Sequence, residues 1–303
     1  MHYSIALLPS SMVALLCGTT FAAGPAPSEL QSILKNTHNS KDYGYPTDIT
    51  RDLHPLWPGL SKGCTSTEAD VWLYNDTLYV GHDQSSLTKE RTLQSLYINP
   101  ILDILERQNP TSPFVTEPTR NGVWDTTPDQ TLYFFIDLKT SGPETFKAVV
   151  KALEPLRQKG YLTTLHGGRN LTNGPVTVIG TGNTPLNMVA HVSDRDYFFD
   201  APLPALNDAE YSNITKFVSP IASTDFAAAV GRITSDTDPV LNNSQVMVLR
   251  DQIALARSRG IGARYWNTPS WPVRTRNLVW RTLLREGVAL LNVDDLDAVL
   301  TEF

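Results

Sequence analysis

The stretch that most constrains how this chain can fold is residues 132–138, Leu-Tyr-Phe-Phe-Ile-Asp-Leu. All but one of its side chains are apolar or aromatic, so the stretch lacks the polar alternation of a strand with one face in water. Such runs are typical of parallel strands, which helices cover on both faces of the sheet. The run therefore predicts an α/β fold.

Strand-like and helix-like segments alternate along the rest of the chain. Further strands are predicted at residues 67–73, 176–180, 197–200, 216–219, 263–266 and 289–293, and helices at residues 92–108, 144–159, 244–259 and 275–285. In a chain of 303 residues this alternation favours a (β/α)8 barrel of parallel strands. Only about seven strands can be counted, and the missing one falls at the front, where Pro55, Pro58 and Gly59 disfavour both strand and helix. We expect a barrel domain over residues 56–303, incomplete at its first strand and preceded by a leader segment at residues 24–55.

Two acidic residues share one face of the predicted strand at residues 67–73. Alternate side chains of an extended chain point the same way, which places Glu68 and Asp70 together. After a predicted tight turn at Asn75-Asp76, a second strand brings His82 back towards them. Two carboxylates beside an imidazole indicate a metal and a proton shuttle, although a Glu-x-Asp pair on a strand is more often a solvated face.

Asp137 and Lys139 form a second charged pair, at the end of the buried strand. Their spacing of two residues turns both side chains the same way. Buried charges are costly unless they are paired or bound to an ion. The pair is read either as a structural ion pair or, with Glu68, Asp70 and His82, as part of one site.

The N-terminus indicates entry into the secretory pathway. Residues 5–8 and 12–17 are mainly apolar and small residues follow them, which predicts a signal peptide over residues 1–23, although no Lys or Arg precedes the apolar stretch. An uncleaved anchor is the alternative. The expectation is a secreted protein, because no later segment is long and apolar enough to span a bilayer.

Glycosylation and cysteine usage fit the same compartment. Four N-x-[ST] sequons predict glycosylation, at Asn75, Asn170, Asn213 and Asn242. Cleavage of the signal peptide would remove Cys17 and leave Cys64 alone, so no intramolecular disulfide is expected. Cys64 is read as a small buried residue rather than a nucleophile. The net charge of −6 argues against a nucleic-acid partner.

Three blocks of sequence carry a resemblance to a known family. They are Gly63–Trp72 with its Glu-Ala-Asp-Val-Trp core, Leu78–Asp83, and Phe135–Thr140, and the likeness extends through residues 97–100, 264–269 and 291–296. These blocks resemble the phospholipase-C-like phosphodiesterase superfamily, which includes glycerophosphodiester phosphodiesterases, and within it the fungal altered inheritance of mitochondria protein 6 family. The resemblance covers most of the chain from Gly63 onward.

The resemblance implies a metal-assisted phosphoric diester hydrolase of lipid metabolism. Glu68, Asp70 and Asp137 would hold one divalent cation, Mg²⁺ or Ca²⁺, because hard oxygen ligands suit hard cations. Lys139 would neutralise a phosphoryl oxygen, and His82 would act as general acid towards the leaving oxygen. Trp266 would form a wall for the substrate, or would be an ordinary core aromatic. The implied partner is a phosphodiester or lysophospholipid-like small molecule, with contact to a membrane surface.

The chain departs from the family pattern at its first histidine. These enzymes use two histidines, and the block that carries the first one, with some ten to fifteen residues, is expected after Thr50-Arg51-Asp52 and is missing there. His54 and, less well placed, His38 are the only nearby substitutes, while His166 and His191 are read as surface or structural residues.

Three alternatives to an active phosphodiesterase follow. The first is a catalytically impaired barrel that binds lipid or metal, because losing one of two proton-transfer partners costs roughly 10² to 10⁴ in rate. The second is an incomplete gene model, broken between Pro55 and Leu56. The third is a glycoside hydrolase, which is disfavoured because that chemistry takes its two acids from separate strand ends.

Overall fold

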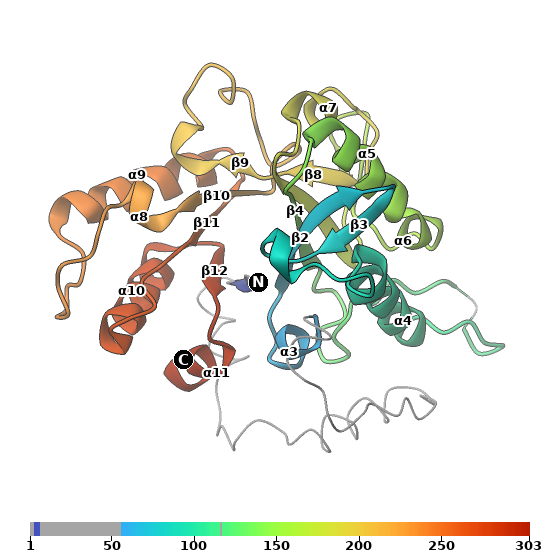
Figure 1. Ribbon diagram of the computed structural model, residues 1–303, viewed down its shortest axis with the longest axis horizontal. Helices are drawn as coiled ribbons and strands as arrows, with labels where there is room; N and C mark the ends of the chain where they lie inside the picture. Colours follow the sequence, from blue (N-terminus) through green and yellow to red (C-terminus); the bar gives the residue numbers. More distant parts are fainter. Residues whose placement is uncertain (1–2, 7–55, 116) are drawn as a thin grey trace. The chain divides into compact units, whose positions relative to one another are not determined.

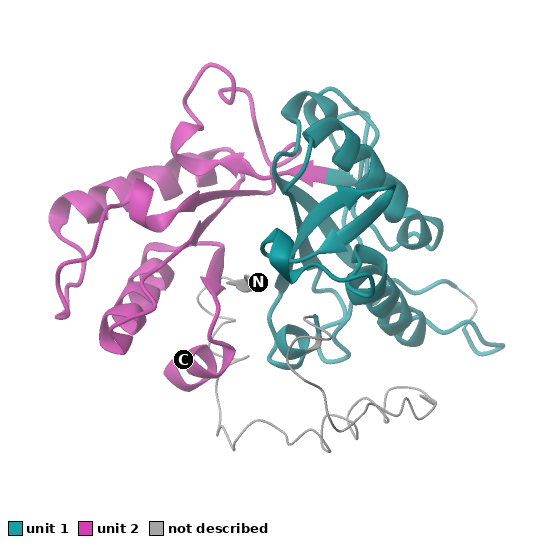
Figure 2. Cartoon of the chain, viewed as in Figure 1, with its two compact units in different colours: residues 1, 19–197 teal, residues 2–18, 198–303 magenta. Residues whose placement is uncertain are grey.

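Strand β4 (Leu132–Leu138) pairs in parallel with β2 (Ser66–Tyr74) on one side and with β7 (Val176–Gly182) on the other. The computed structural model describes residues 3–6, 56–115 and 117–303. These residues divide into two compact units, shown in Figure 2, whose described parts are residues 56–197 without residue 116, and residues 3–6 with 198–303. Parallel pairing of β4 on both edges confirms the α/β class expected from its apolar sequence.

A hairpin completes the sheet of the first unit. Strand β3 (Thr77–Val80) returns antiparallel to β2. The turn between them has Asn75 and Asp76 at φ 46° and 61°, the left-handed pair that a two-residue hairpin turn requires. The tight turn expected at these two residues is therefore present, and it brings the segment after β3 back along β2.

Helices of the first unit cover this sheet (Figure 1). They are the six-residue α3 (Leu56–Ser61), the π-helical turn η2 (Gln94–Ile98), α4 (Asn99–Gln108), α5 (Gly142–Ala152), α6 (Glu154–Gln158) and α7 (Leu186–Ala190). Helix α5 contacts β2, β3 and β4. A short 3-10 turn, η1 (Gln84–Ser86), follows β3, and a separate hairpin joins β5 (Thr164–His166) to β6 (Asn170–Thr172).

Two expectations for helices in this unit were wrong. The helix expected at residues 144–159 is two helices, because Pro155 has no N–H to donate to the carbonyl of Lys151 and its ring collides with that carbonyl. Conversely, residues 56–61 do form a helix, because Pro58 lies in the first turn, where backbone N–H groups have no partner within the helix.

The second unit repeats the alternation of strand and helix. Its parallel strands follow the order β9 (Ala201–Pro202), β10 (Ile221–Asp225), β11 (Gly262–Trp266) and β12 (Leu290–Val293). Helices α8 (Phe226–Ala229), α9 (Asn243–Ser258), α10 (Val273–Glu286) and α11 (Leu296–Glu302) alternate with them, and η3 (Leu203–Ala205) follows β9. Helix α9 packs on β11 and α10 on β12. Strand β8 (Tyr197–Phe199) lies at the boundary between the units.

One strand of the second unit begins later in the chain than the sequence predicted. The strand expected at residues 216–219 is a turn, in which Val218 and Ser219 both donate their N–H groups to the carbonyl of Thr215. Pro220 follows, and the strand begins only after it, at Ile221.

The N-terminal expectations fall largely outside the described residues. Within the segment assigned to a signal peptide, the structure describes one strand, β1 (Tyr3–Ala6), which pairs antiparallel with β12. The rest of that segment, the leader segment, Cys17, His38 and His54 lie outside the described residues. Among the helices that are described, none is long and apolar enough to cross a membrane.

Candidate metal centre

Three carboxylates meet on one face of the parallel pair β2 and β4. Glu68 and Asp70 lie on β2, and Asp137 lies on β4 directly opposite Asp70 in the strand register. One carboxylate oxygen from each residue lies within 4.8 Å of the other two. Two oxygens on opposite sides of a cation, each about 2.4 Å from it, would be about 4.8 Å apart. The spacing therefore matches the coordination sphere of a single divalent ion.

Burial disfavours the ionised form of these three carboxylates when no cation is bound. Glu68 and Asp70 are only 7% and 6% exposed, and Asp137 is largely covered. Burial raises the pKa of the Asp137 carboxyl, and the negative charges of Asp70 and Glu68 raise it further, while Lys139 partly offsets both effects. The site thus concentrates negative charge in a poorly solvated place.

Lys139 supplies one positive charge to this cluster. Its ammonium lies 2.6 Å from Asp137 Oδ2 and 3.2 Å from Asp70 Oδ1. Burial opposes the charged ammonium, but the hydrogen bonds and charges of Asp137 and Asp70 together outweigh burial, so the pKa of Lys139 is raised. Lys139 thus counters part of the negative charge of Asp70 and Asp137, and a divalent cation would counter more of it.

The imidazole of His82 reaches the same cluster from the end of the hairpin. Its Nδ1 lies 3.3 Å from Asp70 Oδ2. The backbone on either side of it is held in place. Trp72 donates its indole N–H to the carbonyl of Gly81, at 2.8 Å, and the Asp83 side chain accepts the backbone N–H groups of Ser85 and Ser86 in η1. The His82 side chain is 69% exposed, so it can reach a bound molecule while Asp70 orients its ring.

Tyr97 supports the cluster from behind. It is fully buried on η2, its hydroxyl donates to the backbone carbonyl of Glu68 at 2.9 Å, and its ring stacks on Phe134 of β4 at 5.3 Å between centroids. The sequence contained Tyr97 in a block that resembles the family, but no role was assigned to it. A tyrosine in an apolar helical segment gives no sign of which backbone carbonyl it meets.

The donor set fits a hard divalent cation. All three side chains offer carboxylate oxygens, and within the described residues no cysteine or histidine belongs to the group that could hold a metal. Oxygen-only sets favour Mg²⁺ or Ca²⁺ over zinc. The cluster could therefore bind a divalent metal.

The sequence of this chain is similar to those of known proteins. The sequence model of the AIM6-like phosphodiesterase domain matches residues 34–200, more than half of the chain, and that range contains the whole cluster. The chain belongs to this family. The altered inheritance of mitochondria protein 6 homolog of Arthroderma benhamiae is 49% identical over 305 residues, which cover 94% of this chain and 96% of the relative.

More distant members of the AIM6-like phosphodiesterase family also match over most of this chain. Proteins named altered inheritance of mitochondria protein 6 from Eremothecium gossypii and from Saccharomyces cerevisiae strain YJM789 are 34% and 32% identical. The alignments cover 88% and 90% of this chain, and 69% and 73% of those relatives. No solved structure matches the chain. The family match indicates a phosphodiesterase-like fold.

Other residues singled out in the sequence of this AIM6-like chain do not belong to the group of three carboxylates. Trp266 ends β11 in the second unit and is 36% exposed. Cys64 is buried, and its burial raises the pKa of the thiol to about 12, which confirms it as a small buried residue.

The two histidines read as surface or structural residues lie outside the group of three carboxylates. His166 lies 3.4 Å from Asp194 at an exposed hairpin, and His191 follows α7. All four sequon asparagines are exposed: Asn75, Asn170, Asn213 and Asn242.

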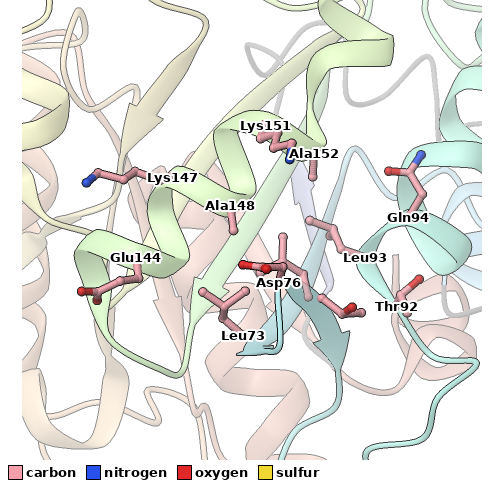
Figure 3. Close-up of a pocket in the computed structure, with 12 residues that line it drawn as sticks. Leu73, Asp76, Thr92, Leu93, Gln94, Glu144, Lys147, Ala148, Lys151 and Ala152 are labelled. Carbon is pink, nitrogen blue, oxygen red and sulfur yellow. The ribbon is translucent and has the colours of Figure 1, made fainter.

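A pocket of about 600 Å³ opens elsewhere on the first unit, between α5, the β2–β3 hairpin and the start of η2 (Figure 3). It mixes leucines and alanines with charges of both signs, and Figure 3 shows Lys147 extending away from Leu93. Its lining contains none of the three acids, nor Lys139 or His82. The carboxylate cluster, rather than this pocket, is the candidate site.

Proposed function

We propose that this protein is a metal-assisted phosphoric diester hydrolase built on a (β/α)8 barrel. One observation carries the proposal: three carboxylates, one ammonium and one imidazole converge from β2, β4 and the end of the β2–β3 hairpin. Hydrolysis of a phosphodiester needs charge stabilisation at the phosphoryl oxygens and a proton for the leaving oxygen. The cluster contains a residue suited to each task.

Each residue has a distinct role in this proposal. Glu68, Asp70 and Asp137 would hold Mg²⁺ or Ca²⁺, which when bound would polarise the phosphoryl group. Lys139 is already held by two of these carboxylates, so its ammonium would face a second phosphoryl oxygen without a reorganisation cost. Asp70 holds Nδ1 of His82, so the proton that His82 would give to the leaving oxygen is the one on Nε2.

The proposed substrates are glycerophosphodiesters or lysophospholipid-like diesters. The resemblance of the Glu68, Asp70, His82 and Lys139 blocks to phospholipase-C-like phosphodiesterases supports this class. Trp266, half-exposed at the end of β11, is proposed as an apolar contact for the substrate. Secretion and glycosylation are part of the same proposal, and the exposure of all four sequon asparagines supports them.

The test is turnover of a diester panel by the purified full chain. Glycerophosphocholine, lysophosphatidylcholine and sphingomyelin would be incubated with Mg²⁺, with Ca²⁺, and with EDTA. The proposal expects metal-dependent hydrolysis that Asp70→Asn and His82→Ala reduce by roughly 10² or more. Hydrolysis that persists in EDTA, or that both variants retain, would contradict it.

A second candidate is a barrel that binds metal or lipid without turnover. The alignment with the Arthroderma benhamiae relative is 305 residues long but uses 94% of this 303-residue chain, so the relative contains residues with no counterpart here. This favours loss of the block expected to carry the first histidine. Metal binding by the wild type, together with no turnover of any diester in the panel, would support this candidate over the hydrolase.

A further inference from the structure

Gly182 ends β7 beside the candidate metal centre. In the register of β7 and β4, Gly182 lies opposite Leu138, and the preceding Thr181 lies opposite Asp137. Gly182 has φ +62°, and the turn closes when the N–H of Thr184 bonds to the carbonyl of Thr181 at 3.3 Å. The chain therefore leaves the sheet right next to the side chain of Asp137.

The absence of a side chain at Gly182 leaves space that the Asp137 carboxylate fills. A Cβ at this position would lie 1.9 Å from Asp137 Oδ1 and 3.0 Å from its Cγ. The other oxygen, Oδ2, accepts from Lys139 at 2.6 Å. Lys139 and the space over Gly182 thus fix the two oxygens of one carboxylate.

We propose that Gly182 is a positioning residue for Asp137, and that its lack of a Cβ allows Asp137 to reach the cation. The inference rests on the proposed role of Asp137 as a metal ligand. Any side chain at position 182 would push Oδ1 away, because a carboxylate group rotates more easily than the backbone around it moves. The carboxylate would then leave the position within 4.8 Å of Glu68 and Asp70 that a shared ion requires.

A simpler role for Gly182 is the turn alone. Its positive φ is strained for any residue with a Cβ, and a Cβ would also approach the carbonyl oxygen of Leu138 at 2.9 Å. Gly160 provides the matched comparison, because it has φ +70° at the end of α6 and a Cβ there would meet nothing closer than Arg120, at 4.0 Å. Gly160→Ala therefore carries the backbone strain without the contact to Asp137.

The experiment measures Mn²⁺ binding to the full chain by the loss of the free-ion EPR signal. Mn²⁺ stands in for a hard divalent cation. Gly182→Ala is expected to weaken binding about 10- to 100-fold, as loss of a group that orients a ligand does, whereas Gly160→Ala leaves affinity unchanged. Equal affinities for Gly182→Ala and wild type would overturn the inference while leaving the metal site intact. Absence of binding by the wild type would overturn the proposed metal site itself.

A double-mutant cycle with Asp137→Ala separates the effect of the contact between residue 182 and Asp137 from a general loss of folding. If Gly182 acts through Asp137, adding Gly182→Ala to Asp137→Ala causes no further loss of affinity, because the smaller side chain leaves room. The melting temperature of the metal-free protein gives a second readout. Gly182→Ala should lower it more than Gly160→Ala does, and Asp137→Ala should reduce that excess to the part caused by the approach to the Leu138 carbonyl. If Gly182→Ala alone fails to fold, folding of the double variant supports the contact. If the single and the double variant both fail to fold, the proposed contact is contradicted.

Discussion

Replacing Lys139 by methionine should make the protein less stable without metal and yet a better binder of metal. Methionine keeps the length of the side chain and removes its charge. The ammonium lies 2.6 Å from Asp137 and 3.2 Å from Asp70, so it counters the charge of two of the three clustered acids. Without it, the acids repel one another until a proton or a divalent ion enters.

The size of the effect follows from these distances. At an effective dielectric constant of about 20, Coulomb's law gives roughly 5–6 kcal/mol for each of the two contacts. The net loss is smaller, because Asp137, whose pKa burial already raises, can take up a proton in the variant. We expect a decrease of about 2–4 kcal/mol in the free energy of unfolding of the metal-free protein, somewhat below the roughly 3–5 kcal/mol typical of buried ion pairs that lose one partner.

Metal should reverse much of this loss. A cation bound to the variant no longer competes with an ammonium for Asp70 and Asp137, so its affinity should rise about 10-fold, which adds about 1.4 kcal/mol of stability at saturating metal. Turnover should fall nonetheless, because the charge facing the phosphoryl oxygen is gone.

Urea denaturation with EDTA and with saturating Mg²⁺, together with Mn²⁺ titration, measures these effects. Lys147→Met is the control, since Lys147 is exposed on α5 and does not belong to the cluster. Weaker metal binding by Lys139→Met than by wild type would refute the electrostatic argument. So would a metal-free stability equal to that of the control.

Three further outcomes are expected. Tyr97→Phe removes the buried hydroxyl that bonds to the Glu68 carbonyl, so the free energy of unfolding should fall by about 1–2 kcal/mol in urea denaturation; an unchanged value would mean that the bond contributes nothing. Cys64, with its thiol pKa raised to about 12, should resist iodoacetamide at pH 8 in the native protein and react in urea, as peptide mass spectrometry would show. Because burial raises the pKa of Asp137, its folded form holds a proton to higher pH than the unfolded chain does. Lowering the pH from 7 towards the ordinary aspartate value of about 4 should therefore weaken Mn²⁺ binding and favour the folded metal-free state. An affinity that does not change over this range would argue against Asp137 as a ligand.

Short-range patterns were enough to predict much of the candidate site. The alternation of side chains along a strand put Glu68 and Asp70 on one face, and the Asn75-Asp76 turn placed His82 near them. The apolar sequence of residues 132–138 predicted a parallel strand, and parallel pairing with β2 places Asp137 opposite Asp70. These features depend on periodicity of two residues and on turn chemistry, both of which a sequence shows directly.

Long-range contacts and proline effects account for what the sequence did not show. The Tyr97 hydroxyl meets a carbonyl 29 residues away, and Gly182 lies beside a carboxylate from another strand, so no local pattern signals either contact. The effect of a proline depends on its position in the helix, which the predictions from sequence did not take into account. The helix predicted at residues 144–159 ran through Pro155, where the structure breaks it, whereas Pro58 was read as a breaker and is accommodated in α3. The strand expected before Pro220 fails for the same reason, because pairing resumes only after the proline.

The direct pairing of Asp70 with Asp137 limits how evolution can lengthen or shorten this protein. Because strand side chains alternate, inserting or deleting a single residue in β2 or β4 would turn every following side chain to the opposite face and separate the acids. The connection between α4 and β4 is under no such restriction, since its two ends are anchored by the elements themselves. Among AIM6-like phosphodiesterases, differences in chain length should therefore accumulate in such connections, while the number of residues from Glu68 to Asp70 and the spacing of Asp137 from the start of β4 stay constant.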